Sequence, residues 1–155
     1  MSLEEARVIV VVYTAVLLPL IIYFFNKSKI PSWVPSFYII AVIVCAIGWE
    51  IWFTFGWLDG DPVDIRRSAA LNTWLPKNIN WLMNSMGDAG AVLLGGFWLM
   101  WLTHNKDNSV FLEWKWSAFI VLLAWCIGQN ILVEMFLYHD QLAEGKPLSW
   151  APLSP

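Results

Sequence analysis

The residues best suited to chemistry in this sequence are three acids that stand in apolar runs, namely Glu50, Asp88 and Glu134. Glu50 belongs to "GWEIWFTFGW", and the stretch before it, "FYIIAVIVCAI", carries no charge. An acid at the centre of a membrane helix costs about 2.5–3.5 kcal/mol on insertion scales, so such residues usually face the interior of a helix bundle. A chain that places acids there must neutralise them, pair them or use them.

Amide side chains accompany two of these acids. Asn84 precedes Asp88 by about one helical turn, and Asn130 stands four residues before Glu134, on the same face of a helix. Gln129 flanks that face. Acids and amides on several helices predict a shared polar pocket.

Carboxyl groups that lie close together in a low dielectric cannot all ionise, so one or more is expected to hold a proton near neutral pH. A protonated acid beside an ionised one is an acid/base pair. We predict Glu50 and Asp88 as this pair, with Asn130 and Glu134 orienting or sharing the proton. The alternative interpretation is that neutral acids bond to amides and only hold the helices in register.

Three tryptophans, Trp49, Trp52 and Trp81, are predicted to line the same pocket, together with Asn84 and Gln129. Their π faces can stabilise a carbocation by roughly 0.5–2 kcal/mol each. This combination favours proton-driven isomerisation or cyclisation of an apolar, lipid-soluble substrate.

The composition predicts the environment of these residues. Of the 155 residues, 59% are hydrophobic and 14% are charged, whereas about a quarter of a soluble domain is charged. Twelve tryptophans suit the lipid–water interface. The net charge of −3 is small and the basic residues are scattered, so nothing indicates nucleic acid as a partner. We therefore predict a multi-pass integral membrane protein, in a membrane that the sequence does not name.

About 20 mostly apolar residues are needed for a spanning helix. Four segments qualify, and the chain is predicted to be one all-α membrane domain over 1–155, with spans at about 8–25, 33–57, 86–103 and 116–139. Residues 58–85 are predicted to form an amphipathic interfacial segment, with Pro62 starting a helix that Asp61 caps. Residues 142–155 hold three prolines and are predicted to be an extended tail.

This topology places the three acids near the same side of the bundle. Glu50 is late in the second span and Asp88 is early in the third, while Glu134 is late in the fourth, which runs antiparallel to the third. The two arginines of the connecting segment, Arg66 and Arg67, are expected by default to face lipid headgroups.

Three stretches together suggest a family: Trp49 and Glu50 late in the second span, "MGDAGAVLLGGFWLMW" in the third, and "IGQNILVEMFLYHDQLAEGKPLSW" in the fourth and the segment after it. They resemble the corresponding helices of the EXPERA family, whose members include a sterol isomerase and the sigma-two receptor. The resemblance covers about residues 46–150 and implies a four-helix membrane bundle with isomerase activity on a sterol. Two positions depart from the isomerase pattern. Ala46 stands where it has a histidine, and Glu134 falls one place after the matching position.

Three functions remain open from the sequence. The first is an enzyme that transfers protons within a sterol, a terpenoid or another lipid, and the second is a non-catalytic lipid- or sterol-binding protein. The third is a small accessory subunit of a larger membrane complex, with membrane-protein partners or further copies of the chain. The sequence implies no cofactor and no metal site, because neither His104 nor His139 has a second His or Cys placed beside it.

Overall fold

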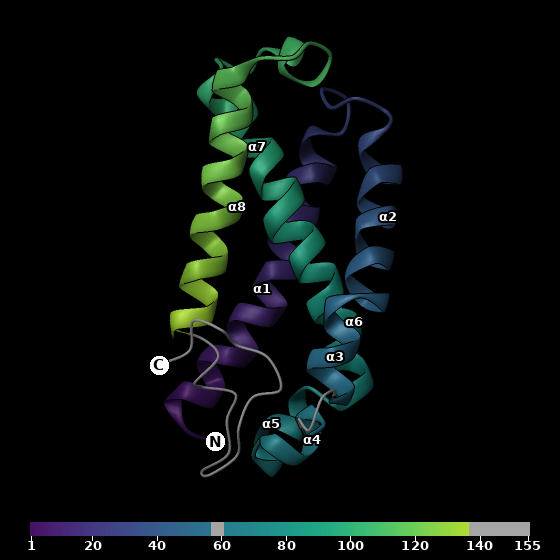
Figure 1. The fold of residues 1–155 in the computed structure, drawn as a ribbon, viewed down its shortest axis with the longest axis vertical. Helices are drawn as coiled ribbons and strands as arrows, with labels where there is room; N and C mark the ends of the chain where they lie inside the picture. The colour runs from purple at the N-terminus through teal and green to yellow at the C-terminus, as the bar shows by residue number, and fades with distance from the viewer. Residues whose placement is uncertain (57–60, 137–155) are drawn as a thin grey trace.

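The computed structural model describes residues 1–56 and 61–136, and this part of the chain consists of helices joined by turns (Figure 1). The expected tail, residues 142–155, lies outside the described residues. In chain order, the elements are α1 (Leu3–Asn26), α2 (Val34–Ile47), α3 (Trp49–Phe55), α4 (Val63–Arg66), α5 (Ala69–Trp74), α6 (Lys77–Gly87), η1 (Asp88–Leu94), α7 (Gly95–Thr103), η2 (Asn108–Phe111) and α8 (Trp116–Phe136).

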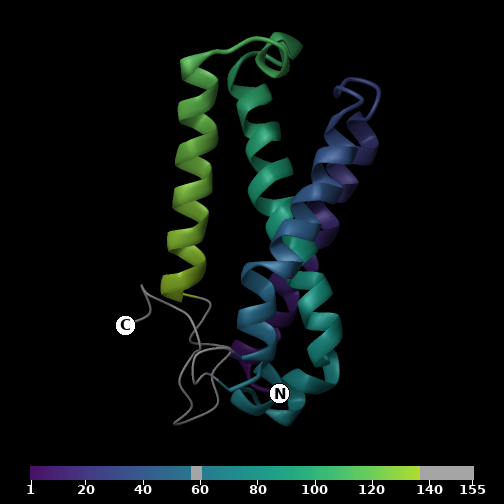
Figure 2. The same cartoon turned by 45° about the vertical axis from the view of Figure 1, so that its right-hand side comes forward.

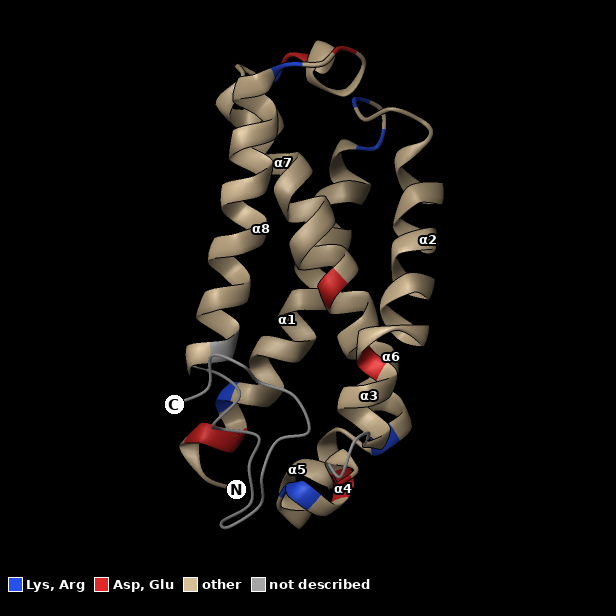
Figure 3. Ribbon diagram, viewed as in Figure 1, with Lys and Arg blue, Asp and Glu red and all other residues tan. Residues whose placement is uncertain are grey.

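Within the described residues, three helices are long and apolar enough to cross a membrane, and a fourth crossing results if the bent pair α2 and α3 counts as one span. The charged residues are concentrated at the two ends of the bundle, and few occur along its length (Figure 3). This distribution fits an apolar layer between two aqueous boundaries. The all-helical architecture and the apolar spans agree with the prediction from the sequence.

The first helix begins earlier than expected, at Leu3 rather than near residue 8. Ser2 and Glu5 form a capping box, in which each side chain accepts a hydrogen bond from the other residue's backbone N–H. The box satisfies N–H groups that a helix N-terminus leaves without partners. It thereby extends the helix beyond its apolar run.

The second span is broken. The axes of α2 and α3 differ by 42° across Gly48. A Cβ atom at this position would lie 2.8 Å from the carbonyl oxygen of Val44, so the bend needs a glycine. Because the break comes directly before Trp49, it places Glu50 in the first turn of a new helix.

The third span is longer than predicted. It runs without interruption from Lys77 to Thr103 through α6, η1 and α7, instead of starting near residue 86. The polar face of α6 suggested an interfacial helix, but Asn80 and Ser85 on that face are completely buried. The amphipathic pattern therefore reflects polar contacts inside the bundle rather than exposure to headgroups.

The short helices α4 and α5 lie at the end of the bundle that holds the N-terminus (Figure 1). The expectation that Asp61 caps α4 is wrong, since the N-cap residue is Pro62 and no side chain bonds there. Ser68 does cap α5, and its Oγ accepts a hydrogen bond from the backbone of Leu71 at 3.2 Å. The remaining part of the expected interfacial segment is thus two short helical turns packed under α1 and α3.

The last helix packs mainly on α7 and stands apart from α1 and α2 over much of its length (Figure 2). Two glycines allow the close approach. A Cβ atom at Gly96 would lie 2.6 Å from Leu122, and one at Gly95 would lie 3.3 Å from the indole of Trp125. Because α8 packs mainly on α7, the space between α8 and α1 is available for the cavities described below.

Candidate functional site

A cavity of about 480 Å³ lies between α1, α3, the third span and α8. We call it the polar cavity, because it is lined by both Glu50 and Asp88 and by three amide side chains. Among the described residues that line it, none is a lysine, arginine or histidine. The two acids therefore share a cavity wall with neutral neighbours. Its lining residues are Val8, Val11, Val12, Ala15, Ala41, Cys45, Trp49, Glu50, Phe53, Met83, Asn84, Gly87, Asp88, Ala89, Ala91, Val92, Leu93, Gln129, Asn130 and Val133.

Glu50 is the most deeply buried acid of this cavity, with 3% of its surface exposed. The side chains of Asp88, Asn84 and Trp49 lie beside its carboxyl group. The second oxygen, Oε2, is buried without a hydrogen-bond partner. A buried carboxyl oxygen without a partner costs free energy, so this atom is a buried polar group whose hydrogen-bonding capacity the fold leaves unused.

Asp88 is half-buried and interacts with Glu50, as the sequence predicts. It is the first residue of η1, a seven-residue π-helix inside the third span. Segments of this type are rare and occur frequently at functional sites, because the wider turn redirects side chains. The sequence does not predict this π-helix, because its hydrogen-bond pattern depends on packing.

Close packing on α1 fixes the wall that carries Asp88. A Cβ atom at Gly90 would lie 3.1 Å from the carbonyl oxygen of Ala15, and one at Gly87 would lie 3.4 Å from the Ala15 side chain. Larger residues would push α1 away from η1. The small residues on this face therefore set the width of the cavity.

The three predicted amides do line the cavity. Asn84 faces Glu50 from α6. Gln129 and Asn130 approach from α8, where their amide nitrogens donate to the carbonyl oxygen of Cys126 at 3.4 and 2.8 Å. The backbone at Glu134 is part of α8, but its side chain lies outside the described residues. The convergence of all three acids therefore stays a prediction.

Of the three predicted tryptophans, only Trp49 lines the cavity. Trp52 is 40% exposed on the outside of α3. Trp81 donates from its indole nitrogen to the carbonyl oxygen of Ala46 at 2.8 Å. Because Ala46 is in the last turn of α2, this bond ties the broken span to α6, and Trp81 braces the bend instead of contacting the cavity.

Arg66 and Arg67 are buried, contrary to the default expectation of contact with lipid headgroups, with exposed fractions of 1% and 4%. Arg66 donates to the carbonyl oxygen of Phe53, and its guanidinium lies 4.8 Å from the centre of the Phe53 ring. Arg67 donates to Asn80 Oδ1 at 2.8 Å and to the Leu75 carbonyl at 2.7 Å. The pair closes the end of the bundle beneath the polar cavity, where Phe53 is part of the lining.

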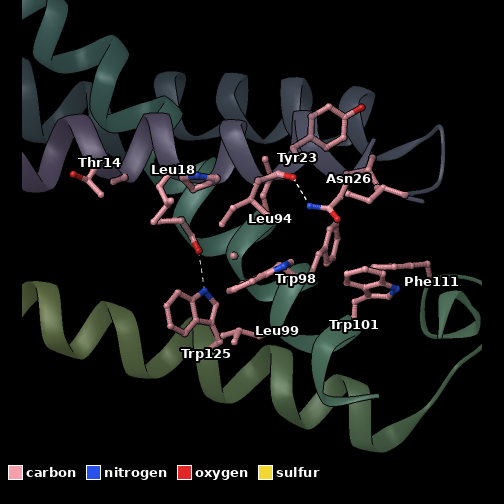
Figure 4. A pocket seen from close by; sticks show the side chains of 18 residues that line it. Thr14, Leu18, Tyr23, Asn26, Leu94, Trp98, Leu99, Trp101, Phe111 and Trp125 are labelled. Carbon is pink, nitrogen blue, oxygen red and sulfur yellow. Dashed lines mark hydrogen bonds between the residues drawn. The ribbon is translucent and has the colours of Figure 1, made fainter. Parts of the chain in front are cut away.

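A second cavity, of about 420 Å³, lies farther along α1 between that helix, α7 and α8 (Figure 4). We call it the apolar cavity, because most of its wall is aliphatic or aromatic, and none of the described residues that line it is charged. In Figure 4, Trp98 and Trp125 lie between α1 and α8. Sequence reasoning missed this cavity, because its lining residues are spread over the chain and resemble ordinary core residues.

Comparison with known proteins identifies no relative. The chain matches no protein-family model, and no curated protein or solved structure matches it. In the part of the chain that the structure describes, no group of three His, Cys, Asp or Glu side chains could hold a metal ion.

Proposed function

We propose that this protein is an integral membrane enzyme that crosses the bilayer four times and isomerises or cyclises a lipidic substrate by proton transfer. Glu50 and Asp88 are the acid/base pair, and the substrate belongs to the sterol, terpenoid or related lipid classes. The observation that carries the proposal is the pairing of these two acids in a cavity wall, with Glu50 Oε2 unpartnered.

The reaction balances with these groups alone. One carboxylic acid donates its proton to a carbon–carbon double bond, whose electron pair forms the new C–H bond and leaves a carbocation on the other carbon. The neighbouring carboxylate then removes a proton from an adjacent carbon, and that C–H electron pair forms the new double bond. A proton passing between the two acids restores the starting state, so no co-reactant is needed.

Two groups of the cavity support the charged intermediate. The indole face of Trp49 can stabilise a carbocation by roughly 0.5–2 kcal/mol. Asn84 lies beside the Glu50 carboxyl group and orients it within the cavity. The absence of cationic side chains among the described lining residues leaves the developing positive charge unopposed.

The test uses purified protein, lipid extract from its source membranes and D2O. We expect the wild type to produce a lipid that carries one solvent deuteron, because the proton delivered to carbon comes from an exchangeable carboxyl group. Glu50→Gln should abolish incorporation, and the matched control Glu113→Gln, at an exposed position outside both cavities, should not. No deuterated lipid with the wild type, or undiminished incorporation with Glu50→Gln, would refute the proposal.

A non-catalytic lipid-binding function is the second candidate. The observation that favours it is the apolar cavity, which offers binding surface without reactive groups. Native mass spectrometry of the wild type distinguishes the enzyme from the non-catalytic lipid-binding protein. A lipid that is retained and never exchanges hydrogen with solvent supports the binding protein, whereas stable protein partners without retained lipid support an accessory subunit.

A further inference from the structure

The polar cavity and the apolar cavity adjoin each other along α1. Ala15 of α1 and Ala91 of η1 line both of them. The polar cavity contacts α1 from Val8 to Ala15, and the apolar cavity contacts it from Thr14 to Asn26. At about 1.5 Å per residue, the stretch from Val8 to Asn26 is about 27 Å long, which approaches the thickness of a bilayer's hydrocarbon core.

The polarity of the lining residues differs on the two sides of Ala15 and Ala91, where the cavities adjoin. On one side the lining includes two acids and three amides, and on the other it includes Trp98, Trp101 and Trp125 and no charged residue among those described. Water gains little in an apolar cavity, since such cavities stay dry unless an apolar ligand fills them. The occupant of the second cavity is therefore an apolar group.

Trp125 lies beside Ala91, one of the two residues that line both cavities. Its indole nitrogen donates to the carbonyl oxygen of Ala91 at 2.8 Å, so its polar edge is satisfied (Figure 4). A Cβ atom at Gly95 would lie 3.3 Å from the same ring. The fixed ring and the two alanines therefore lie where the two cavities adjoin.

We propose that the substrate is an elongated lipid with its reactive end at Glu50 and Asp88 and an unbranched or isoprenoid tail that passes Ala91 into the apolar cavity. This inference rests on the proposed function for the identity of the reactive end. The location of the tail follows from the two wall residues that the cavities share, Ala15 and Ala91. The length of the two adjoining cavities then selects substrates by tail length.

The experiment uses photoactivatable isoprenoid alcohols, geraniol and geranylgeraniol, each with a diazirine at the end far from the hydroxyl group. We expect the long probe to label Tyr23, Trp98 or Leu99 in the apolar cavity of the wild-type protein. The short probe should label only the polar cavity, at residues such as Met83 or Val92. Peptide mass spectrometry locates the label.

Ala91→Leu adds bulk to the wall that the two cavities share. It should reduce labelling of the apolar cavity by the long probe about tenfold, since added methylene groups in filled space are costly. The short probe should be unaffected. Ala124→Leu, at an exposed position of α8, is the matched control. Labelling that is confined to the polar cavity, or spread over exposed residues such as Ile120 and Leu123, would overturn the proposal.

Bilayer lipid is the competing occupant. Suppression of the long-probe label by unlabelled geranylgeraniol, but not by excess phosphatidylcholine, supports the proposal, and equal suppression by both would overturn it. The labelling pattern does not depend on turnover. If Glu50→Gln retains the label while wild type fails to incorporate deuterium, the tail site stands and the proposed chemistry fails.

Discussion

Two pairs of like-charged residues lie inside this molecule, Arg66 with Arg67 and Glu50 with Asp88, and the fold surrounds each pair differently. Arg66 and Arg67 donate to backbone carbonyl oxygens and to Asn80. Glu50 and Asp88 face each other in a cavity wall, and Glu50 Oε2 has no partner. The arginine pair donates most of its hydrogen bonds to oxygens of neighbouring helices, with Arg67 Nε left over, whereas the acid pair faces a cavity.

The arginine pair shows how a buried charge becomes structural. The Phe53 carbonyl that Arg66 contacts lies in the last turn of α3, where carbonyl oxygens lack helical partners and the helix dipole favours a cation. Burial, and to a lesser degree the neighbouring Arg66, lowers the pKa of Arg67 to about 10. Arg67 therefore stays charged at neutral pH, and both guanidinium groups make their contacts within the protein.

The largest expected effect concerns the acid pair. Asp88→Asn should reduce turnover about 10²–10⁴-fold, the usual contribution of a positioned acid or base, and change stability little, because an amide of the same shape replaces the carboxyl group. The double variant with Glu50→Gln should be no slower than either single variant, since the two groups act as a unit. Deuterium incorporation and thermal unfolding in detergent measure the two properties. Additive losses would show that the acids act separately.

For the arginine pair, we expect a substitution to reduce stability rather than turnover. Arg67→Met should lower the free energy of unfolding by about 3 kcal/mol, because two buried hydrogen bonds to a charged group are lost, each worth about 1.5–3 kcal/mol. Lys29→Met, at an exposed position, is the control. Thermal unfolding in detergent measures the change. If Arg67→Met is stable but inactive, Arg67 has a role in function rather than in stability, and the contrast between the two pairs is wrong.

A smaller effect is expected at Asn80, which is completely buried and accepts from Arg67. Asn80→Ala should cost about 1–3 kcal/mol, the usual penalty for leaving a buried donor unsatisfied. Combined with Arg67→Met, it should show a coupling energy of about 0.5–3 kcal/mol. Unfolding of the two single variants and the double variant gives this coupling. Independent losses would mean that the bond between them adds nothing to stability.

The smallest effect is expected at an exposed acid, Asp107, in the turn after α7. Hydrogen bonds from Ser109, and to a lesser degree Lys115, lower the pKa of Asp107 to about 2. Because the folded pKa is below the unfolded value near 3.9, this contribution to stability is complete above about pH 4 and is lost as the pH falls toward 2. Asp107→Asn should remove a small part of the acid sensitivity of unfolding between these values. An unchanged pH profile would contradict the expectation.

The sequence by itself determined the all-helical, apolar class of the protein and the proximity of Glu50 and Asp88. Long apolar runs require helices in a bilayer, because every backbone polar group must be satisfied within the segment. The order of the spans then brings the end of the second beside the start of the third. Glu50, Asp88 and Asn84 could therefore be placed together from helix lengths alone.

Only the tertiary structure decided which residues surround that pair. Trp81 and Trp52 stand at the spacing expected of lining residues, yet one braces the bend after α2 and the other faces outward. The break at Gly48 and the π-helix at Asp88 rotate side chains by amounts that helical periodicity cannot give. A one-dimensional pattern fixes which face of a helix is polar, but packing decides whether that face meets solvent, a cavity or, as for Arg66 and Arg67, the carbonyl ends of other helices.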